Sequence, residues 1–153
     1  MPTEENKLAV FSHDSFMKEA LKEANIAFDE QEVPVGAVVV LKNRIIARGY
    51  NQTERLNDVT AHAEMIAITS ASNYLTSKYL SECTLYVTLE PCTMCASAIG
   101  WAQLGRIVYG VDDPKKGYSL VDANFLHPKA KVKRGVMKDE CAELLIRFFE
   151  ARR

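Results

Sequence analysis

Hydrophobic and polar residues follow two different periods along this chain, and the changes of period divide it into helices and strands. Over residues 14–30 the apolar side chains recur every three or four positions, which predicts an amphipathic helix. The runs 36–41 and 44–50 are rich in β-branched residues and are separated by two polar residues, so they predict a β-hairpin. The remaining pattern predicts helices over residues 60–74, 92–104 and 138–152 and strands over residues 84–89, 106–111 and 131–136.

The segments between these elements determine how the elements are joined. Residues 51–58 and 112–130 contain polar residues, Gly, Pro or Asn without a regular period, so they predict loops, the longer one with some helix. Strands that alternate with helices imply a mixed sheet with helices packed on both faces. The sequence therefore predicts a single α/β domain, residues 1–153, with three layers (α/β/α) of which the middle one is a mixed five-stranded sheet.

The composition is that of an ordinary globular protein. The chain has 153 residues, of which 48% are apolar and 25% are charged. The polar and acidic residues 1–7 do not resemble a signal peptide, and the longest apolar run, residues 35–41, is too short to cross a bilayer. We therefore expect a cytoplasmic location and no membrane contact. In a reducing compartment, paired cysteines indicate a metal site or catalysis rather than a disulfide.

The net charge of −1 conceals an asymmetry between two parts of the chain. Residues 1–113 hold nine lysines and arginines against fifteen aspartates and glutamates, a balance of −6. Residues 114–153 hold ten against five, a balance of +5. A basic last quarter on an acidic body indicates either contact with a polyanion or a solvated charged surface, and charge alone does not separate the two.

Two short motifs carry the candidate chemistry, H-x-E at residues 62–64 and P-C-x-x-C at residues 91–95. His62, Cys92 and Cys95 supply the nitrogen and thiolate ligands that zinc prefers. Cysteines three positions apart share one face of a helical turn, and a helix N-terminus favours the thiolate. We therefore expect these three residues to hold one Zn²⁺ per subunit, with a water or hydroxide in the fourth position, as in catalytic zinc sites.

Glu64 is the candidate catalytic residue. It lies two positions after His62, and residues two apart on a helix do not face each other. Its carboxylate is therefore expected to border the open coordination position and to move protons between water and substrate. H-x-E followed by P-C-x-x-C is the signature of the zinc nucleobase deaminases.

A structural zinc site is the alternative interpretation of the same cysteine pair. Such a site needs a fourth protein ligand, for which the remaining candidates are Cys83, Cys141, His13 and His127. None of them lies at a tight spacing from the first three ligands. H-x-E at a helix start favours the catalytic interpretation, because a lone structural cysteine pair does not require it.

The chain resembles the cytidine-deaminase-like superfamily and, within it, the bacterial tRNA adenosine deaminases. The resemblance extends from residue 16 to residue 152 and is specific. It is carried by the blocks at residues 32–38, 60–64, 85–92 and 105–110 and by the ending at residues 139–142, 147–149 and 152–153. It implies the cytidine-deaminase-like fold, a homodimer, and hydrolytic deamination of the wobble adenosine of a tRNA anticodon loop to inosine.

The same resemblance implies a set of substrate contacts. Asn51 is expected to hydrogen-bond the target nucleotide, and Asp113 to face the nucleic-acid backbone near it. The backbone N–H of Ala63 and the backbone around Leu89 and Glu90 are expected to border the base. From the residues alone, Asn51 and Asp113 are equally well explained as turn residues.

Two other functions remain open at this point. The first is deamination of a free base or nucleoside such as guanine or cytosine, which Trp101-Ala102 favours because this pair resembles free-guanine deaminases of the same superfamily. The second is a zinc-stabilised binding module without catalysis, against which Glu64 argues. The basic last quarter favours RNA. Its candidate phosphate contacts are Lys115, Lys116, Lys129, Lys131, Lys133, Arg152 and Arg153.

Overall fold

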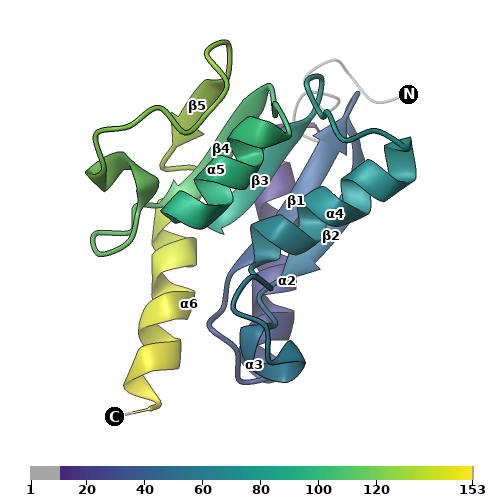
Figure 1. The fold of residues 1–153 in the computed structure, drawn as a ribbon. Coiled ribbons are helices and arrows are strands. Elements are labelled where there is room, and N and C mark those ends of the chain that lie inside the picture. The colour runs from purple at the N-terminus through teal and green to yellow at the C-terminus, as the bar shows by residue number, and fades with distance from the viewer. Residues whose placement is uncertain (1–10, 153) are drawn as a thin grey trace.

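A five-stranded mixed sheet forms the centre of the molecule. The computed structural model describes residues 11–152. The strands are β1 (Gly36–Leu41), β2 (Arg44–Tyr50), β3 (Thr84–Leu89), β4 (Arg106–Val111) and β5 (Lys131–Arg134), and they lie in the order β2-β1-β3-β4-β5. Strand β1 is antiparallel to both of its neighbours, whereas β3, β4 and β5 are parallel (Figure 1). The predicted mixed sheet is confirmed.

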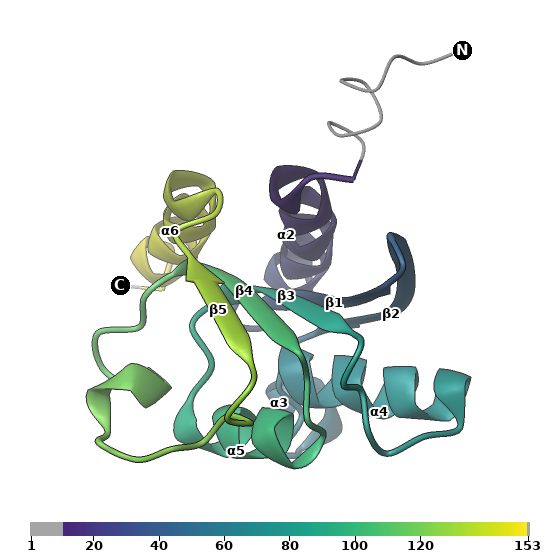
Figure 2. The same cartoon turned by 90° about the horizontal axis from the view of Figure 1, so that it is seen from above.

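Helices cover both faces of this sheet, as the sequence predicted (Figure 2). Helices α2 (His13–Asp29) and α6 (Lys138–Glu150) pack on one face. Helices α4 (Ala63–Leu75) and α5 (Thr93–Trp101) lie on the other. Strand β1 is apolar throughout because it contacts both layers: Val38 packs with the α2 side, and Ala37 and Val39 pack with the α4 side.

The hairpin β1–β2 has the bounds that the sequence predicted. Lys42 and Asn43 form its two-residue turn, with φ angles of 49° and 62°. Positive φ at both central residues matches the right-handed twist of the flanking strands. The hairpin brings β2 back along β1 and directs the chain into the segment that precedes α4.

Several predicted boundaries were wrong. Thr60 does not cap α4; its hydroxyl donates to Asp58, and His62 is the N-cap residue instead. Helix α5 begins after Cys92 and ends at Trp101, so Pro91 lies before the helix rather than in its first turn. Strand β5 stops at Arg134 because Gly135, with φ of 80°, turns the chain away.

The two segments predicted as loops contain short helices. Helix α3 (Thr53–Leu56) lies in the first, and the 3₁₀ helix η1 (Tyr118–Leu120) lies in the second. Four- and three-residue helices leave no periodic signal in a sequence, which explains why the pattern did not reveal the first of them. Within residues 11–152, none of the helices combines the length and the apolar character that a membrane span requires.

The sheet also brings the starts of α4 and α5 together, although the two helices do not follow neighbouring strands. Strands β2 and β3 are not neighbours, because β1 lies between them. Both are antiparallel to β1, so they run in the same direction and the chain leaves both at one edge of the sheet. Gly49 allows α4 to approach β2 closely, since a Cβ there would lie 2.6 Å from the carbonyl oxygen of Ala63.

Candidate active site

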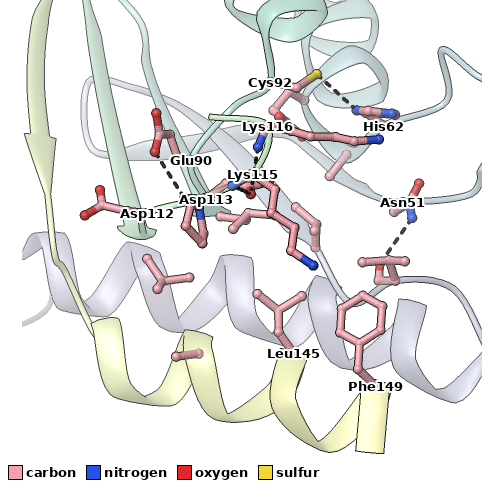
Figure 3. A pocket seen from close by; sticks show the side chains of 18 of the residues that line it. Asn51, His62, Glu90, Cys92, Asp112, Asp113, Lys115, Lys116, Leu145 and Phe149 are labelled. Atoms are coloured by element: carbon pink, nitrogen blue, oxygen red, sulfur yellow. Dashed lines mark hydrogen bonds between the residues drawn. The ribbon is translucent and has the colours of Figure 1, made fainter. Parts of the chain in front are cut away.

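His62, Cys92 and Cys95 meet where α4 and α5 begin. His62 and Cys92 are the N-cap residues of the two helices, and Cys95 lies in the first turn of α5. The Nδ1 atom of His62 is 3.7 Å from the sulfur of Cys92 and 3.5 Å from that of Cys95. Figure 3 shows His62 and Cys92 facing each other at one end of a cavity. The three predicted ligands thus converge through Nδ1 and two sulfurs.

These distances can be tested against tetrahedral zinc. With bonds of about 2.3 Å to sulfur and about 2.0–2.1 Å to nitrogen, tetrahedral angles place a sulfur and a nitrogen ligand about 3.5–3.6 Å apart. The observed separations fit, and the ligand atoms of all three residues lie within 4.8 Å of one another. One imidazole and two sulfurs also match the ligand preference of zinc. The three residues therefore fit a zinc ion.

The two sulfurs have opposite tendencies to ionise. A hydrogen bond from Cys95, aided by His62, lowers the pKa of Cys92 to about 4. The same bond to Cys92, together with burial, raises the pKa of Cys95. The hydrogen bond with Cys92 raises the pKa of His62. Cys92 is thus stabilised as a thiolate, the form that binds metals.

Glu64 lies beside this group. It is in the first turn of α4, is 4% exposed and lines the cavity. Burial raises the pKa of its carboxyl group, and the side chain lies within hydrogen-bonding range of Cys95. A raised pKa means that the carboxyl group holds a proton more readily than an exposed carboxyl group does, which suits a group that accepts and returns protons in general acid–base catalysis.

The four residues considered as a fourth ligand all lie elsewhere. His13 pairs with the Tyr86 hydroxyl at 2.8 Å, and Nδ1 of His127 accepts from the backbone of Lys129. Cys83 and Cys141 are buried in the core. Across residues 11–152, the cluster of possible ligands consists of His62, Cys92 and Cys95 alone. This three-ligand arrangement favours a catalytic site over a structural one.

A cavity of about 640 Å³ opens next to the candidate metal ligands, and His62 and Cys92 form part of its floor. This volume is typical of small-molecule sites. Eight of the nine residues predicted for the site line it, and the ninth, Cys95, is fully buried behind Cys92. The eight lining residues are Asn51, His62, Ala63, Glu64, Leu89, Glu90, Cys92 and Asp113.

Asn51 and Asp113 also have local structural roles. The Asn51 side chain donates to the carbonyl oxygen of Val33 at 3.2 Å and accepts from the backbone of Thr53 at 3.3 Å. The Asp113 carboxylate accepts from the backbone N–H groups of Lys115 and Lys116 at 3.0 and 3.1 Å. Both residues therefore stabilise turns at the rim of the cavity, as the alternative interpretation of each allowed.

The sequence reasoning missed one wall of the cavity. Leu145 and Phe149 of α6 contribute apolar side chains to it, and Figure 3 shows both below the loop that carries Asp113. The periodicity of α6 identified an apolar face but not which part of that face stays outside the core. Phe149 is 52% exposed, whereas its neighbour Phe148 is 4% exposed.

The basic residues of the last quarter lie in different parts of the structure. Of the candidate phosphate contacts, Lys115 and Lys116 line the cavity. Lys131 and Lys133 lie on the exposed edge strand β5, where lysines protect a sheet from further pairing. Arg152 donates to the carbonyl oxygens of Phe148 and Gln31, so it secures the end of α6. Arg153 lies outside the described residues.

Trp101 lies away from the main cavity. It was expected in the middle of a helix, but it is the last residue of α5 and is 84% exposed. It lines a second, separate hollow with Phe125 and His127. The residue that favoured a free-base deaminase is therefore not part of the cavity that contains Glu64.

Comparison with known proteins relates the chain to deaminases. The MafB19-like deaminase family matches residues 11–153. The tRNA-specific adenosine deaminase of Agrobacterium fabrum is 47% identical over 90% of this chain and 94% of its own length. The enzyme of the same name from Aquifex aeolicus is 41% identical over 88% of this chain and 92% of its own length.

Solved structures give the same relationship. A structure from a study of A-to-I editing by tRNA:A34 deaminases at the wobble position of transfer RNA has 46% sequence identity and a TM-score of 0.80, and it covers 85% of this chain and 98% of that chain. Guanine deaminase from Bacillus subtilis has 39% identity and a TM-score of 0.63, over 66% of this chain and 65% of that chain. The second likeness covers less of both molecules.

Proposed function

The chain belongs to the family of the tRNA-specific adenosine deaminases, and from this premise we propose that it converts the wobble adenosine of a tRNA anticodon loop to inosine. The observation that carries the proposal is the match to named tRNA-specific adenosine deaminases over about nine-tenths of the chain. The reaction replaces the C6 amino group of adenine by oxygen from water and releases ammonia.

His62, Cys92 and Cys95 would hold the zinc ion, one in each subunit. When bound, zinc lowers the pKa of a coordinated water to near neutrality and so supplies the nucleophile. Two thiolates and a neutral imidazole balance the charge of the metal. The position of these ligands at the floor of the cavity places the reacting carbon of a bound base close to Glu64.

Glu64 would move the protons of the reaction. Its carboxylate would take one proton from the attacking water and deliver it to N1 of the adenine ring. It would then take the remaining proton of the new C6 hydroxyl group and deliver it to the amino group, which leaves as ammonia. The burial of Glu64 raises the pKa of its carboxyl group and so supports this role, because the carboxyl group has to hold a proton between accepting it and releasing it. The backbone N–H of Ala63 and the backbone of Leu89 and Glu90 would hold the edge of the base.

The rim of the cavity would bind the rest of the nucleotide. Asn51 and Asp113 would contact the flipped-out nucleotide and its backbone. Lys115 and Lys116 would neutralise nearby phosphates. Leu145 and Phe149 provide an apolar wall against which flanking bases can stack. Flanking bases of an RNA can use this wall and the lysines in addition to the floor of the cavity, so the rim favours a polymer substrate over free guanine or cytosine.

The proposal is tested by incubating the purified protein with an anticodon stem-loop that carries a wobble adenosine and, separately, with free guanine, cytosine and nucleosides. We expect inosine in the RNA and no turnover of the free bases. Glu64→Gln, with zinc content measured, serves as the control for the active site. Deamination of guanine with the RNA left intact would overturn the proposal in favour of the free-base alternative.

Two further properties stay predictions. We propose a homodimer on the basis of the family resemblance and a cytoplasmic location on the basis of the proposed tRNA substrate. Sedimentation of the purified chain at micromolar concentration tests the first, and fractionation of cells that produce the tagged full chain tests the second. A monomer that edits RNA at the full rate would exclude a catalytic need for the dimer.

A further inference from the structure

The rim loop, which we define as residues 112–120, has little regular structure of its own, yet five of its residues line the cavity: Asp112, Asp113, Pro114, Lys115 and Lys116. It is held by one buried carboxylate. The Glu90 side chain accepts from the backbone N–H of Asp113 at 3.1 Å, from the backbone N–H of Ser119 at 3.0 Å, and from the Ser119 hydroxyl at 2.7 Å. Glu90 is 2% exposed, so water does not compete for these bonds.

The loop also packs directly against this carboxylate. Any side chain at Gly117 would collide with the Glu90 carboxyl group, so the backbone of the loop lies against it. On either side, Cys92 and Gly117 form an isolated β-bridge, and the Tyr118 N–H donates to the Pro91 carbonyl oxygen at 3.0 Å. The segment that delivers the metal ligand Cys92 thus also supports the rim loop.

A chain of hydrogen bonds leads from Glu90 to the lysines. Glu90 fixes the N–H of Asp113, and the carboxylate of Asp113 fixes the N–H groups of Lys115 and Lys116. Figure 3 shows the Glu90 carboxylate turned toward Asp113 and the Lys116 side chain beside His62. The position of both lysines at the cavity therefore depends on the hydrogen bonds that the Glu90 carboxylate makes to the rim loop.

We infer that Glu90 is a positioning residue, whose carboxylate orders the rim loop so that Lys115 and Lys116 are placed to bind the phosphates of the substrate RNA. This inference rests on the proposed function for its substrate. It assigns to the Glu90 side chain a role that differs from the backbone contact with the base expected from the family resemblance. It predicts an effect on RNA binding rather than on the chemical step.

The chain offers a matched comparison on the opposite rim. Glu32 is 1% exposed and accepts from the backbone N–H groups of Glu54 and Arg55 at 3.0 and 2.8 Å. It therefore holds helix α3, which follows Asn51, as Glu90 holds the rim loop. Both are buried carboxylates bonded to two backbone N–H groups, but only Glu90 is bonded to the loop with the lysines.

The inference is tested by a double-mutant comparison with the anticodon stem-loop as substrate. Glu90→Gln keeps the size of the side chain but turns an N–H₂ toward one of the loop donors. We expect KM to rise about tenfold, equivalent to about 1.4 kcal/mol, with kcat changed less than about twofold and zinc content unchanged. Ser119→Ala removes one hydrogen bond and is expected to have a smaller effect in the same direction.

A protein that lacks both lysines tests whether Glu90 acts through them. In a Lys115→Ala/Lys116→Ala protein, Glu90→Gln is expected to raise KM less than about twofold, because the loop no longer carries the charges that it positions. Glu32→Gln is expected to change KM by the same factor in the wild-type protein and in the Lys115→Ala/Lys116→Ala protein. An equal rise for Glu90→Gln in both backgrounds, or a loss of kcat and zinc with KM unchanged, would overturn the inference.

Hydrogen exchange separates this inference from the proposed function. In Glu90→Gln we expect faster exchange at the amides of Asp113 and Ser119, with the amides of Glu54 and Arg55 unchanged. This result does not require any activity. If the wild-type protein does not edit RNA, the proposed function fails. If exchange in the rim loop does not change, the role of Glu90 fails.

Discussion

The floor and the rim of the cavity are built in different ways. The floor, His62, Glu64, Cys92 and Cys95, lies at the starts of two helices that a twisted sheet holds in place. The rim consists of residues 112–120, the segment around α3 and one face of α6, and its first two parts are held by the buried carboxylates of Glu90 and Glu32. In the proposed function, the floor would carry out the reaction and the rim would select the substrate.

The largest effect is expected from removing a metal ligand in the floor. Cys95→Ala leaves two ligands at a site that needs three, so zinc content should fall well below one ion per chain and deamination should become undetectable. Metal analysis and an inosine assay measure this. Cys83→Ala, which changes a buried cysteine outside the group, should retain both zinc and activity. Full zinc occupancy in Cys95→Ala would show that another residue completes the site.

A substitution in the rim should give a different result. In Gly117→Ala the new methyl group collides with the Glu90 carboxyl group, so this carboxyl group or the rim loop has to shift and the hydrogen bonds between them are disturbed. We expect a loss of about 1–3 kcal/mol in the free energy of unfolding, typical of overpacking. We also expect a higher KM for RNA with zinc retained. Gly135→Ala is the control, because a Cβ there meets no atom within 4 Å and strains only the backbone. A zinc-free Gly117→Ala protein would contradict the division into floor and rim.

The salt dependence of RNA binding should distinguish the lysines at the cavity from those on the edge strand. The logarithm of RNA affinity falls with the logarithm of salt concentration by about 0.7 for each phosphate contact to a single strand. Lys115→Ala and Lys116→Ala should each reduce this slope by about that amount. Lys131→Ala/Lys133→Ala, on the edge strand, should leave it unchanged. If the edge-strand pair instead reduced the slope, the RNA would run along β5 rather than over the cavity.

The smallest effect concerns a histidine outside both regions. Burial, followed by the charges of Arg106 and Lys133, lowers the pKa of His13, which pairs with the Tyr86 hydroxyl. Because the pKa is lower in the folded state, protonation favours unfolding, so this contribution is present above the unfolded pKa of about 6.5 and is lost as the pH falls below it. In His13→Gln, the melting temperature should therefore decrease less between pH 7 and pH 5. An identical decrease in both proteins would assign the acid sensitivity to other groups.

The sequence predicted the floor better than the rim for a physical reason. His62, Cys92 and Cys95 lie in short motifs at helix starts, where local spacing determines their geometry. The positions of Phe149 and of the Glu90 side chain depend on contacts between distant segments. The insertion of β1 between β2 and β3 is likewise a long-range pairing, and no local pattern encodes it.

The turns at the rim show the same limit. Asn51 and Asp113 were each assigned two possible roles, and the structure shows the turn role of both in their hydrogen bonds. A substrate contact is compatible with those bonds, because each side chain retains further hydrogen-bonding capacity. Thr60 was wrongly predicted as the N-cap of α4 because threonine is a common capping residue. The N-cap is His62, two positions later, which is not a typical capping residue.

The most direct test of the central claim measures the single-turnover rate of inosine formation with saturating anticodon stem-loop, together with the Kd of the RNA. We expect Glu64→Gln to slow the reaction by about 10³-fold with Kd nearly unchanged. We expect Lys115→Ala/Lys116→Ala to keep the rate and to weaken binding. A Glu64→Gln protein that reacts at the wild-type rate, or a lysine double variant that binds normally but reacts slowly, would contradict the assignment of chemistry to the floor and substrate selection to the rim.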